Sequence, residues 1–334
     1  MVIASTNPMK IEKIREDIEL PIIDLHSDRS QASLQIVKAC EQYGFFKVLN
    51  HGVPQEIIAR MEEEAQGFFA KPGSEKQRAG PANPYGYGCK NIGLKGDIGE
   101  VEYLLLQTNT PFISHKSKCI STDPNKFSYA VIGYVEAVRE LACEILDLMW
   151  EGLGGPEASA LSGLIRDAES DSLLRLNHYP SADVIDHPSP PKIGFGEHTD
   201  PQILTLLRSN GVHGLQISLE DGVWVPVNPY PESAFFVNVG DVLQVMTNGR
   251  FLSVRHRVVV NSYNSRLSMA YFAAPSLDVK INCLSELATP QKPPLYRSFT
   301  WGEYKKATYM RRLGDSRLNL FKLQPDDEKR DSFC

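Results

Sequence analysis

The feature that most restricts the fold of this chain is a succession of short β-rich segments that begins at residue 171. Turn signals such as Asn210-Gly211 and Asn248-Gly249 stand between several of them. Seven or eight such strands at short intervals are typical of a sandwich or a double-sheet jelly roll, so we expect a mainly β protein with helices. The predicted strands are residues 173–179, 203–208, 215–219, 223–227, 234–239, 254–260 and 267–273.

The first 170 residues differ, because helical patterns dominate there. Residues 126–153 carry one apolar stripe and are predicted to form a long helix, whose stripe needs a broad apolar partner such as a sheet face. Residues 79–99 are glycine-rich and are expected to form a flexible loop that presents Tyr85 and Tyr87. The other predicted elements are strands over 21–25 and 45–49 and helices over 33–42 and 54–70.

We expect one compact unit in three parts. Residues 1–170 would form a helical N-terminal support region with short strands, and residues 171–275 the jelly-roll core, supported by the N-terminal and the long central helices. Residues 276–334 would contribute a C-terminal helix, predicted over residues 301–313, and a charged tail after Lys322.

Charge and cysteines indicate the class of protein. The chain has 35 basic and 41 acidic residues, so its net charge is −6. A mildly acidic chain gains little from phosphate backbones or anionic lipid, and we expect neither nucleic acid nor a membrane as partner. Six cysteines without a Cys-x-x-Cys pair are typical of free thiols in a reducing compartment. Because the first 20 residues hold no apolar run, we expect a cytoplasmic or nuclear location, and the oligomeric state stays open.

A metal site is predicted where His198 and Asp200 stand two residues apart and His256 follows later in the chain. In an extended segment, residues i and i+2 point to the same side, so His198 and Asp200 would both face inward. Two imidazoles and one carboxylate are the ligands expected of non-haem Fe(II) oxygenases, although catalytic zinc can use the same set. The spacing alone is weak evidence, since His26 and Asp28 repeat it where a helix cap is expected.

A second, anion-binding site is predicted close to the metal. Arg266 and Ser268 are again two residues apart, and a guanidinium fork with a serine hydroxyl can hold a carboxylate. This pairing favours Fe(II) with an acidic co-substrate over a zinc hydrolase. Arg175, Asn177 and Tyr179 alternate in the same way, but the pattern equally allows their neighbours Leu174, Leu176 and His178 to face inward.

With these residues the chain resembles the plant 2-oxoglutarate- and Fe(II)-dependent dioxygenases over nearly its whole length. The narrower resemblance is to the gibberellin 2-oxidases. The broad resemblance rests on residues 21–25, 40–52, 177–180, 196–200, 240–241, 256–258 and 266–268. The narrower one rests on residues 194–202, 244–251, 79–81, 299–301 and 313–315.

The resemblance implies a double-stranded β-helix fold and an enzyme that uses Fe(II), 2-oxoglutarate and O2. It implies 2β-hydroxylation of C19 gibberellins, which removes their hormone activity. The same chemistry on another small carboxylic acid, such as auxin or a flavonoid-type substrate, and a non-catalytic ligand-binding relative are the alternatives. The resemblance also implies residue roles, namely His198, Asp200 and His256 as iron ligands and Arg266, Ser268, Tyr179 and Asn177 as contacts of 2-oxoglutarate.

A gibberellin is a rigid apolar skeleton with a carboxylate, so its site needs an apolar cavity and one cationic anchor. Arg175 is the candidate anchor, because it precedes Asn177 by two residues. Many plant relatives carry tyrosine at the position of His178, which alternation turns away from the metal. The candidates for closing the mouth of the cavity are Tyr85, Tyr87, Tyr304, Lys306 and Tyr309.

Overall fold

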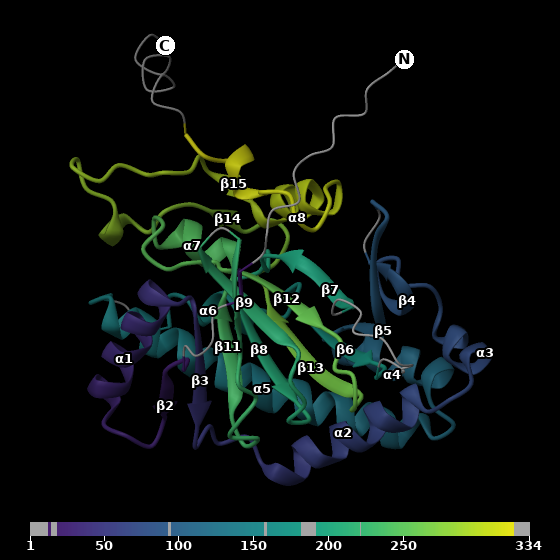
Figure 1. Ribbon diagram of the computed structural model, residues 1–334. Coiled ribbons are helices and arrows are strands. Elements are labelled where there is room, and N and C mark those ends of the chain that lie inside the picture. Colours follow the sequence, from purple (N-terminus) through teal and green to yellow (C-terminus); the bar gives the residue numbers. More distant parts are fainter. Residues whose placement is uncertain are drawn as a thin grey trace, which may run out of the picture.

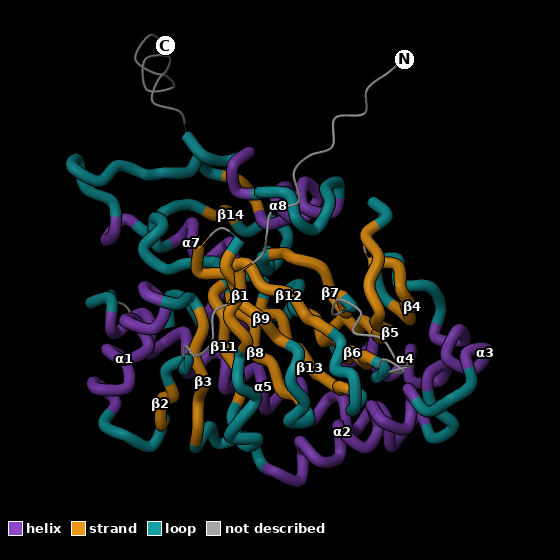
Figure 2. Tube along the Cα trace, viewed as in Figure 1, coloured by secondary structure: helices purple, strands orange, loops and turns teal. Residues whose placement is uncertain are grey.

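The computed structural model describes residues 13–14, 19–92, 95–156, 159–181, 192–220 and 222–323. Its centre consists of two β-sheets, and helices surround them (Figure 1, Figure 2). The larger sheet has the strand order β2-β3-β11-β8-β13-β6-β5-β4, and the smaller has the order β1-β10-β9-β12-β7. An apolar cluster with members from both sheets, such as Tyr103 and Ile217, fills the space between them. The predicted jelly roll is therefore confirmed.

The strands come from the whole length of the described chain. The larger sheet contains β2 (Ile22–Asp24), β3 (Phe45–Leu49), β4 (Gly86–Ile92), β5 (Asp97–Gln107), β6 (Leu173–Tyr179), β8 (Leu204–Ser209), β11 (Phe235–Val239) and β13 (Arg266–Ala273). The smaller sheet contains β1 (Lys13–Ile14), β7 (Ile193–His198), β9 (Leu215–Glu220), β10 (Val223–Pro226) and β12 (Arg255–Val259). A separate pair consists of β14 (Lys280–Ile281) and β15 (Phe299–Thr300).

The helices lie mainly outside the sheets, and α8 lies with the C-terminal segment at one end of them (Figure 1). The α-helices are α1 (Arg29–Gln42), α2 (Gln55–Phe69), α3 (Gly73–Lys76), α4 (Thr110–Ile120), α5 (Pro124–Gly152), α6 (Gly163–Arg166), α7 (Asp241–Met246) and α8 (Trp301–Tyr309). The 3-10 helices are η1 (Gln77–Ala79), η2 (Ser285–Leu287) and η3 (Leu318–Leu320).

The long helix α5 confirms the prediction over residues 126–153 to within two residues at its start. Asp123 caps it by accepting a hydrogen bond from the Lys126 N–H at 3.0 Å, and Pro124 occupies the first turn. Its apolar face contacts α1, α2 and α4 and the strands β8 and β13 of the larger sheet. The predicted sheet partner is thus the outer face of the larger sheet.

Strand β6 shows how alternation divides the interior. Leu174 and Leu176 belong to the apolar cluster between the larger sheet and the helices. Tyr179 belongs to the cluster between the two sheets. Arg175 and Asn177, which have the same parity as Tyr179, therefore share the inner face of the sheet.

The prediction of a flexible loop over residues 79–99 was wrong. Residues 86–92 and 97–107 form the hairpin β4–β5, and β5 also pairs with β6. The glycines suggested a loop, but one of them, Gly88, lies within strand β4 and permits close packing there. A Cβ on Gly88 would lie 2.3 Å from Cζ of Tyr103, so only glycine fits beneath that ring.

Two helix boundaries also differ from the prediction. Helix α1 begins at Arg29, because Asp28 caps it by accepting a hydrogen bond from the Gln31 N–H at 3.0 Å. Helix α8 ends at Tyr309, four residues before the predicted end at 313. The charged tail after Lys322 lies, from residue 324 onward, outside the described residues. No helix in the described ranges is both long and apolar enough to cross a membrane.

Candidate active site

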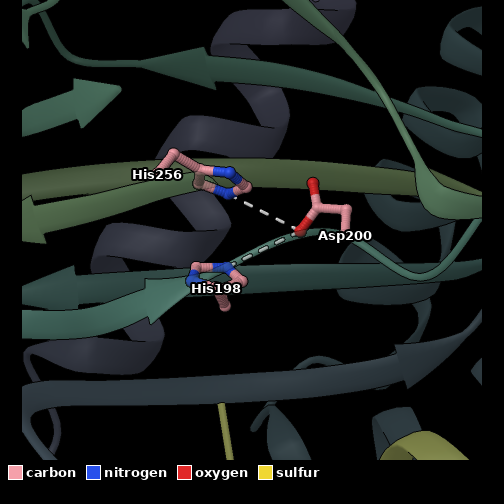
Figure 3. A group of neighbouring side chains, drawn as sticks. All are labelled: His198, Asp200 and His256. Carbon is pink, nitrogen blue, oxygen red and sulfur yellow. Dashed lines mark ion pairs between the residues drawn. The ribbon is translucent and has the colours of Figure 1, made fainter. Parts of the chain in front are cut away.

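The two histidines of the predicted metal site are cross-strand neighbours. Strands β7 and β12 pair antiparallel, and His256 lies opposite His198. Oδ1 of Asp200 is 3.6 Å from Nε2 of each histidine (Figure 3). The potential ligand atoms of the three residues all lie within 4.8 Å of one another. The fold thus brings together the three side chains that the sequence pattern singled out, in a spacing that suits one metal ion.

Hydrogen bonds to the backbone select the nitrogen that faces the centre. Nδ1 of His198 lies 2.8 Å from the Gly196 carbonyl oxygen, and Nδ1 of His256 lies 3.2 Å from that of Val254. A carbonyl oxygen only accepts, so we assign the proton to Nδ1 in both rings. Each Nε2 then presents its lone pair to the centre, which is the tautomer that a metal ligand requires.

The carboxylate of Asp200 is held by its other oxygen. Oδ2 accepts a hydrogen bond from Thr205 Oγ1 at 2.6 Å and another from Asn238 Nδ2 at 2.7 Å. Thr205 and Asn238 lie opposite each other on β8 and β11. The register of the larger sheet therefore orients the carboxylate and leaves Oδ1 available to a metal.

Burial and charge set the protonation states at this centre. Burial lowers the pKa of His198 well below its ordinary value, so the imidazole is neutral at pH 7. Burial by itself raises the pKa of Asp200, but the neighbouring histidines and the two hydrogen bonds outweigh it and leave this pKa below its ordinary value. A neutral imidazole and an ionised carboxylate are the forms that bind a divalent cation.

The predicted anion site lies on the paired strands β13 and β6. Arg266 lies opposite Tyr179, and Ser268 lies opposite Asn177. All four line a cavity of about 70 Å³ that the three metal-site residues also line. The antiparallel register of β6 and β13 thus brings together two pairs of residues that are each spaced i, i+2. The side chains of both pairs line the same cavity as the metal-site residues.

Arg266 offers a direct test of whether a dicarboxylate fits this cavity. Arg266 is 3% exposed, and its Nε has no hydrogen-bond partner among the described residues. Its guanidinium carbon lies 5.4 Å from the centre of the Tyr179 ring. A buried cation without a counter-ion is costly, and a bound carboxylate removes that cost. The residues present therefore fit 2-oxoglutarate.

A larger cavity of about 460 Å³ adjoins the smaller one, and His198 and Asp200 line both. This volume lies in the range of small-molecule sites, which is about 300–1,000 Å³. Much of its wall is apolar. The apolar side chains that line it include Ile92, Leu105, Leu173, Phe195, Phe272 and Leu313.

Arg175 also lines both cavities. Its guanidinium carbon lies 4.0 Å from the centre of the Tyr103 ring and 4.6 Å from that of Phe195. Its Nε donates to Asn177 Oδ1 at 2.7 Å, whereas its Nη2 is buried without a partner among the described residues. Arg175 is therefore a second buried cation, held in place by two rings and able to bind a further carboxylate.

The structure brings only some of the predicted substrate residues to the larger cavity. Lys306 and Tyr309 line it. Tyr304 does not, because its fully buried hydroxyl donates to Oδ2 of Asp241 at 2.6 Å. Tyr85 is partly buried, packs edge-on against a ring of α4 and is not among the lining residues.

Tyr87 lies in a polar cluster on the opposite face of β5 and β6. Glu102 accepts hydrogen bonds there from Lys76 at 2.6 Å and from Tyr87 at 2.7 Å, and His178 Nδ1 is 2.8 Å from its other oxygen. Burial by itself raises the pKa of Glu102, but these hydrogen bonds lower it to about 2. His178 therefore faces away from the metal centre, as alternation predicts.

The sequence reasoning missed several polar residues of the larger cavity, among them Gln202, Lys305 and Arg317. Nζ of Lys305 donates to both carboxylate oxygens of Asp171, at 2.8 and 2.6 Å. Nη1 of Arg317 donates to the Thr199 carbonyl oxygen at 3.0 Å. Gln202 could have been found, because it continues the i, i+2 spacing of the metal motif. The two cations could not, because tertiary structure alone brings the C-terminal region over the site.

Comparison with known proteins gives matches over most of the chain. Residues 170–275 match the model of the 2OG-Fe(II) oxygenase superfamily. Residues 20–110 match the model described as non-haem dioxygenase in morphine synthesis N-terminal. Among solved structures, JOX2 in complex with 2OG, Fe and JA is similar with a TM-score of 0.79 and 29% identity, covering 95% of this chain and 92% of that one. The rice dioxygenase for auxin oxidation is similar with a TM-score of 0.75 and 27% identity, covering 91% of this chain and 100% of that one.

Curated relatives are more similar in sequence. Gibberellin 2-beta-dioxygenase 4 of Arabidopsis thaliana is 56% identical, and the match covers 93% of this chain and 97% of that protein. Gibberellin 2-beta-dioxygenase of Phaseolus coccineus is 51% identical, with 92% of both chains covered. Gibberellin 2-beta-dioxygenase 1 of Pisum sativum is 52% identical, with 90% of both covered. Because relatives of this identity match nearly the full chain, the protein belongs to the gibberellin 2-beta-dioxygenase family within the 2OG-Fe(II) oxygenases.

Proposed function

We propose that the protein hydroxylates gibberellins at the 2β position with Fe(II), 2-oxoglutarate and O2, and so inactivates the hormone. The names of its relatives support the reaction and the substrate class. The observation that carries the proposal is the arrangement of two adjoining cavities around one possible metal centre. The smaller holds Arg266, whose Nε has no hydrogen-bond partner among the described residues, and the larger is mostly apolar and holds Arg175.

In this proposal each side chain at the centre has one task. When bound, Fe(II), 2-oxoglutarate and O2 supply an oxidative decarboxylation that yields succinate, CO2 and a hydroxylated product. The chain holds the metal, fixes the co-substrate and positions one C–H bond of the substrate beside it. The proposed metal ligands are Nε2 of His198, Nε2 of His256 and Oδ1 of Asp200, and the proposed contacts of 2-oxoglutarate are Arg266, Ser268, Tyr179 and Asn177.

The proposed anchor of the substrate carboxylate is Arg175. Its guanidinium is oriented by the rings of Tyr103 and Phe195 before any ligand arrives, so little conformational entropy is lost on binding. The apolar wall of the larger cavity suits the fused rings of a gibberellin. Tyr309 and Lys306 on α8 would close the mouth and exclude water from the reaction.

The test is turnover by the purified protein with Fe(II), ascorbate, 2-oxoglutarate and a C19 gibberellin. We expect succinate to form in step with a product that carries one additional oxygen atom at carbon 2. The absence of turnover with every C19 and C20 gibberellin would refute the proposal.

Controls separate this proposal from its alternatives. An auxin and a flavonoid-type acid, assayed in parallel, test the same chemistry on other substrates. Omission of O2 or 2-oxoglutarate should stop the reaction, whereas a zinc hydrolase would remain active. His198→Ala should abolish turnover, because it removes a proposed metal ligand. A biological effect that survives in this variant would indicate a binding protein instead.

We also propose that the protein works in the cytoplasm or nucleus. Five cysteines in the described part of the chain carry free thiols, as is usual in a reducing compartment. Fusion of the chain to a fluorescent protein in plant cells would test this location.

A further inference from the structure

The neutral amide of Gln202 lies on the wall of the larger cavity, and its oxygen has no partner among the described residues. Gln202 lines this cavity and is only 7% exposed. Its Oε1 is buried and accepts no hydrogen bond from any described residue. A buried polar atom in this state lowers stability unless a ligand or water supplies the partner. Because Gln202 lines the cavity, rotation of its side-chain torsions would bring this amide to a polar group of a ligand there.

The backbone beneath this amide is held firmly. The N–H of Val242, at the start of α7, donates to the Gln202 carbonyl oxygen at 3.2 Å. A Cβ on Gly240 would lie 2.0 Å from the same oxygen, so glycine is required for this contact. Because these two contacts restrain the main chain, the amide adjusts to a ligand mainly through its own side-chain torsions.

The position of Gln202 identifies the part of the substrate that it reaches. It follows Asp200 by two residues, and both line the larger cavity. Gln202 therefore lies within two residues of a proposed metal ligand, on the wall of the cavity in which the substrate carbon that is oxidised must lie.

The chemistry of the amide identifies the kind of group. In the proposed function, the carboxylates of 2-oxoglutarate and of the substrate have charged partners in Arg266 and Arg175, which line the two cavities. A carboxamide is neutral, and rotation by 180° exchanges its donor and its acceptor. A hydroxyl group also donates and accepts, so it pairs with either end of the amide.

We propose that Gln202 recognises a substrate hydroxyl on a ring carbon next to the carbon that is oxidised. The inference rests on the proposed function, in which oxidation takes place at carbon 2. The neighbouring ring positions are then carbons 1 and 3. We place the hydroxyl at carbon 3, so that Gln202 makes the enzyme prefer a 3-hydroxylated gibberellin to its 3-deoxy counterpart.

The test compares kcat/KM for a 3β-hydroxylated C19 gibberellin and the same compound without that hydroxyl. We expect the wild-type enzyme to prefer the hydroxylated compound by about 5- to 100-fold, the range for a buried amide that gains or lacks its partner. Gln202→Met keeps the length of the side chain but removes the hydrogen bonding. It should lower kcat/KM for the hydroxylated compound to the value for the deoxy compound and leave the latter nearly unchanged.

A second readout and two further variants guard against a merely structural effect. Calorimetric titration of both gibberellins without iron and under nitrogen should show the same preference in wild type and its loss in Gln202→Met. Gln202→Leu provides a second apolar variant if Gln202→Met fails to fold. Arg175→Lys is the matched control, because it should weaken both gibberellins by the same factor and preserve their ratio.

The outcomes are distinct. A wild-type ratio in Gln202→Met, an equal loss for both compounds, or equal binding of both by wild type would each overturn the role of Gln202. If wild type converts neither gibberellin, the proposed function itself fails. If it converts both but the variants leave the ratio unchanged, only the present inference fails.

Discussion

The hydroxyl of Thr205 should control iron affinity although Thr205 is not a proposed metal ligand. It donates to Oδ2 of Asp200 at 2.6 Å, and Thr205 is only 3% exposed. Water therefore does not readily replace this hydrogen bond when the hydroxyl is removed. In Thr205→Val, the carboxylate keeps only its bond from Asn238 and becomes free to rotate away from the histidines.

The size of the effect follows from the charge on the acceptor. A hydrogen bond to a charged group contributes about 1.5–3 kcal/mol, and each 1.4 kcal/mol corresponds to a factor of ten in binding. Because the Asn238 bond remains, we expect a loss at the lower end of this range. The predicted Kd for Fe(II) of Thr205→Val is about 10- to 30-fold above that of wild type.

The measurement is an anaerobic Fe(II) titration, followed by calorimetry and by the Fe(II) dependence of succinate release. Thr247→Val is the matched control. Thr247 is 1% exposed and donates to the Leu243 carbonyl oxygen at 2.8 Å, so it loses a buried hydrogen bond without touching Asp200. Its Fe(II) affinity should equal that of wild type. A folded Thr205→Val protein with wild-type Fe(II) affinity would refute the reasoning that Oδ2 orients Oδ1.

Three other predictions concern the two buried arginines and the cluster behind the site. Arg266→Lys should raise the KM for 2-oxoglutarate and leave the Fe(II) affinity intact, because a lysine ammonium cannot form the bidentate hydrogen bonds of a guanidinium. An unchanged KM would show that Arg266 does not hold the co-substrate. Arg175→Ala should raise the gibberellin KM about 10- to 100-fold, and an unaltered value would assign the anchor to another cation. The pKa of Glu102 is lowered to about 2, so its stabilisation is complete above pH 4.5 and is lost as the pH falls toward 2. In Glu102→Gln, the free energy of unfolding, measured by urea denaturation, should depend less on pH over this interval than it does in wild type. A pH dependence equal to that of wild type would contradict the role of the cluster.

Local periodicity made much of this protein predictable from its sequence. Alternation along β6 and β13 placed Arg175 and Arg266 in one set with their i+2 neighbours, and the structure has both sets on the inner face. The apolar stripe over residues 126–153 predicted α5 and its sheet partner. These inferences succeeded because a period of two or 3.6 residues depends only on the backbone conformation of one segment.

Other features depended on contacts between distant segments. Three features have no signature in the local sequence. These are the register that places His256 opposite His198, the support of Asp200 by Thr205 and Asn238, and the hairpin in the glycine-rich region. The sequence also indicated Tyr304 as a candidate for the cavity mouth, but its hydroxyl donates a hydrogen bond to Asp241 of another helix. The sequence alone therefore determined which residue types face inward along each strand. Tertiary structure decided which of them meet, because strand register and helix docking minimise the free energy of the whole chain rather than of one segment.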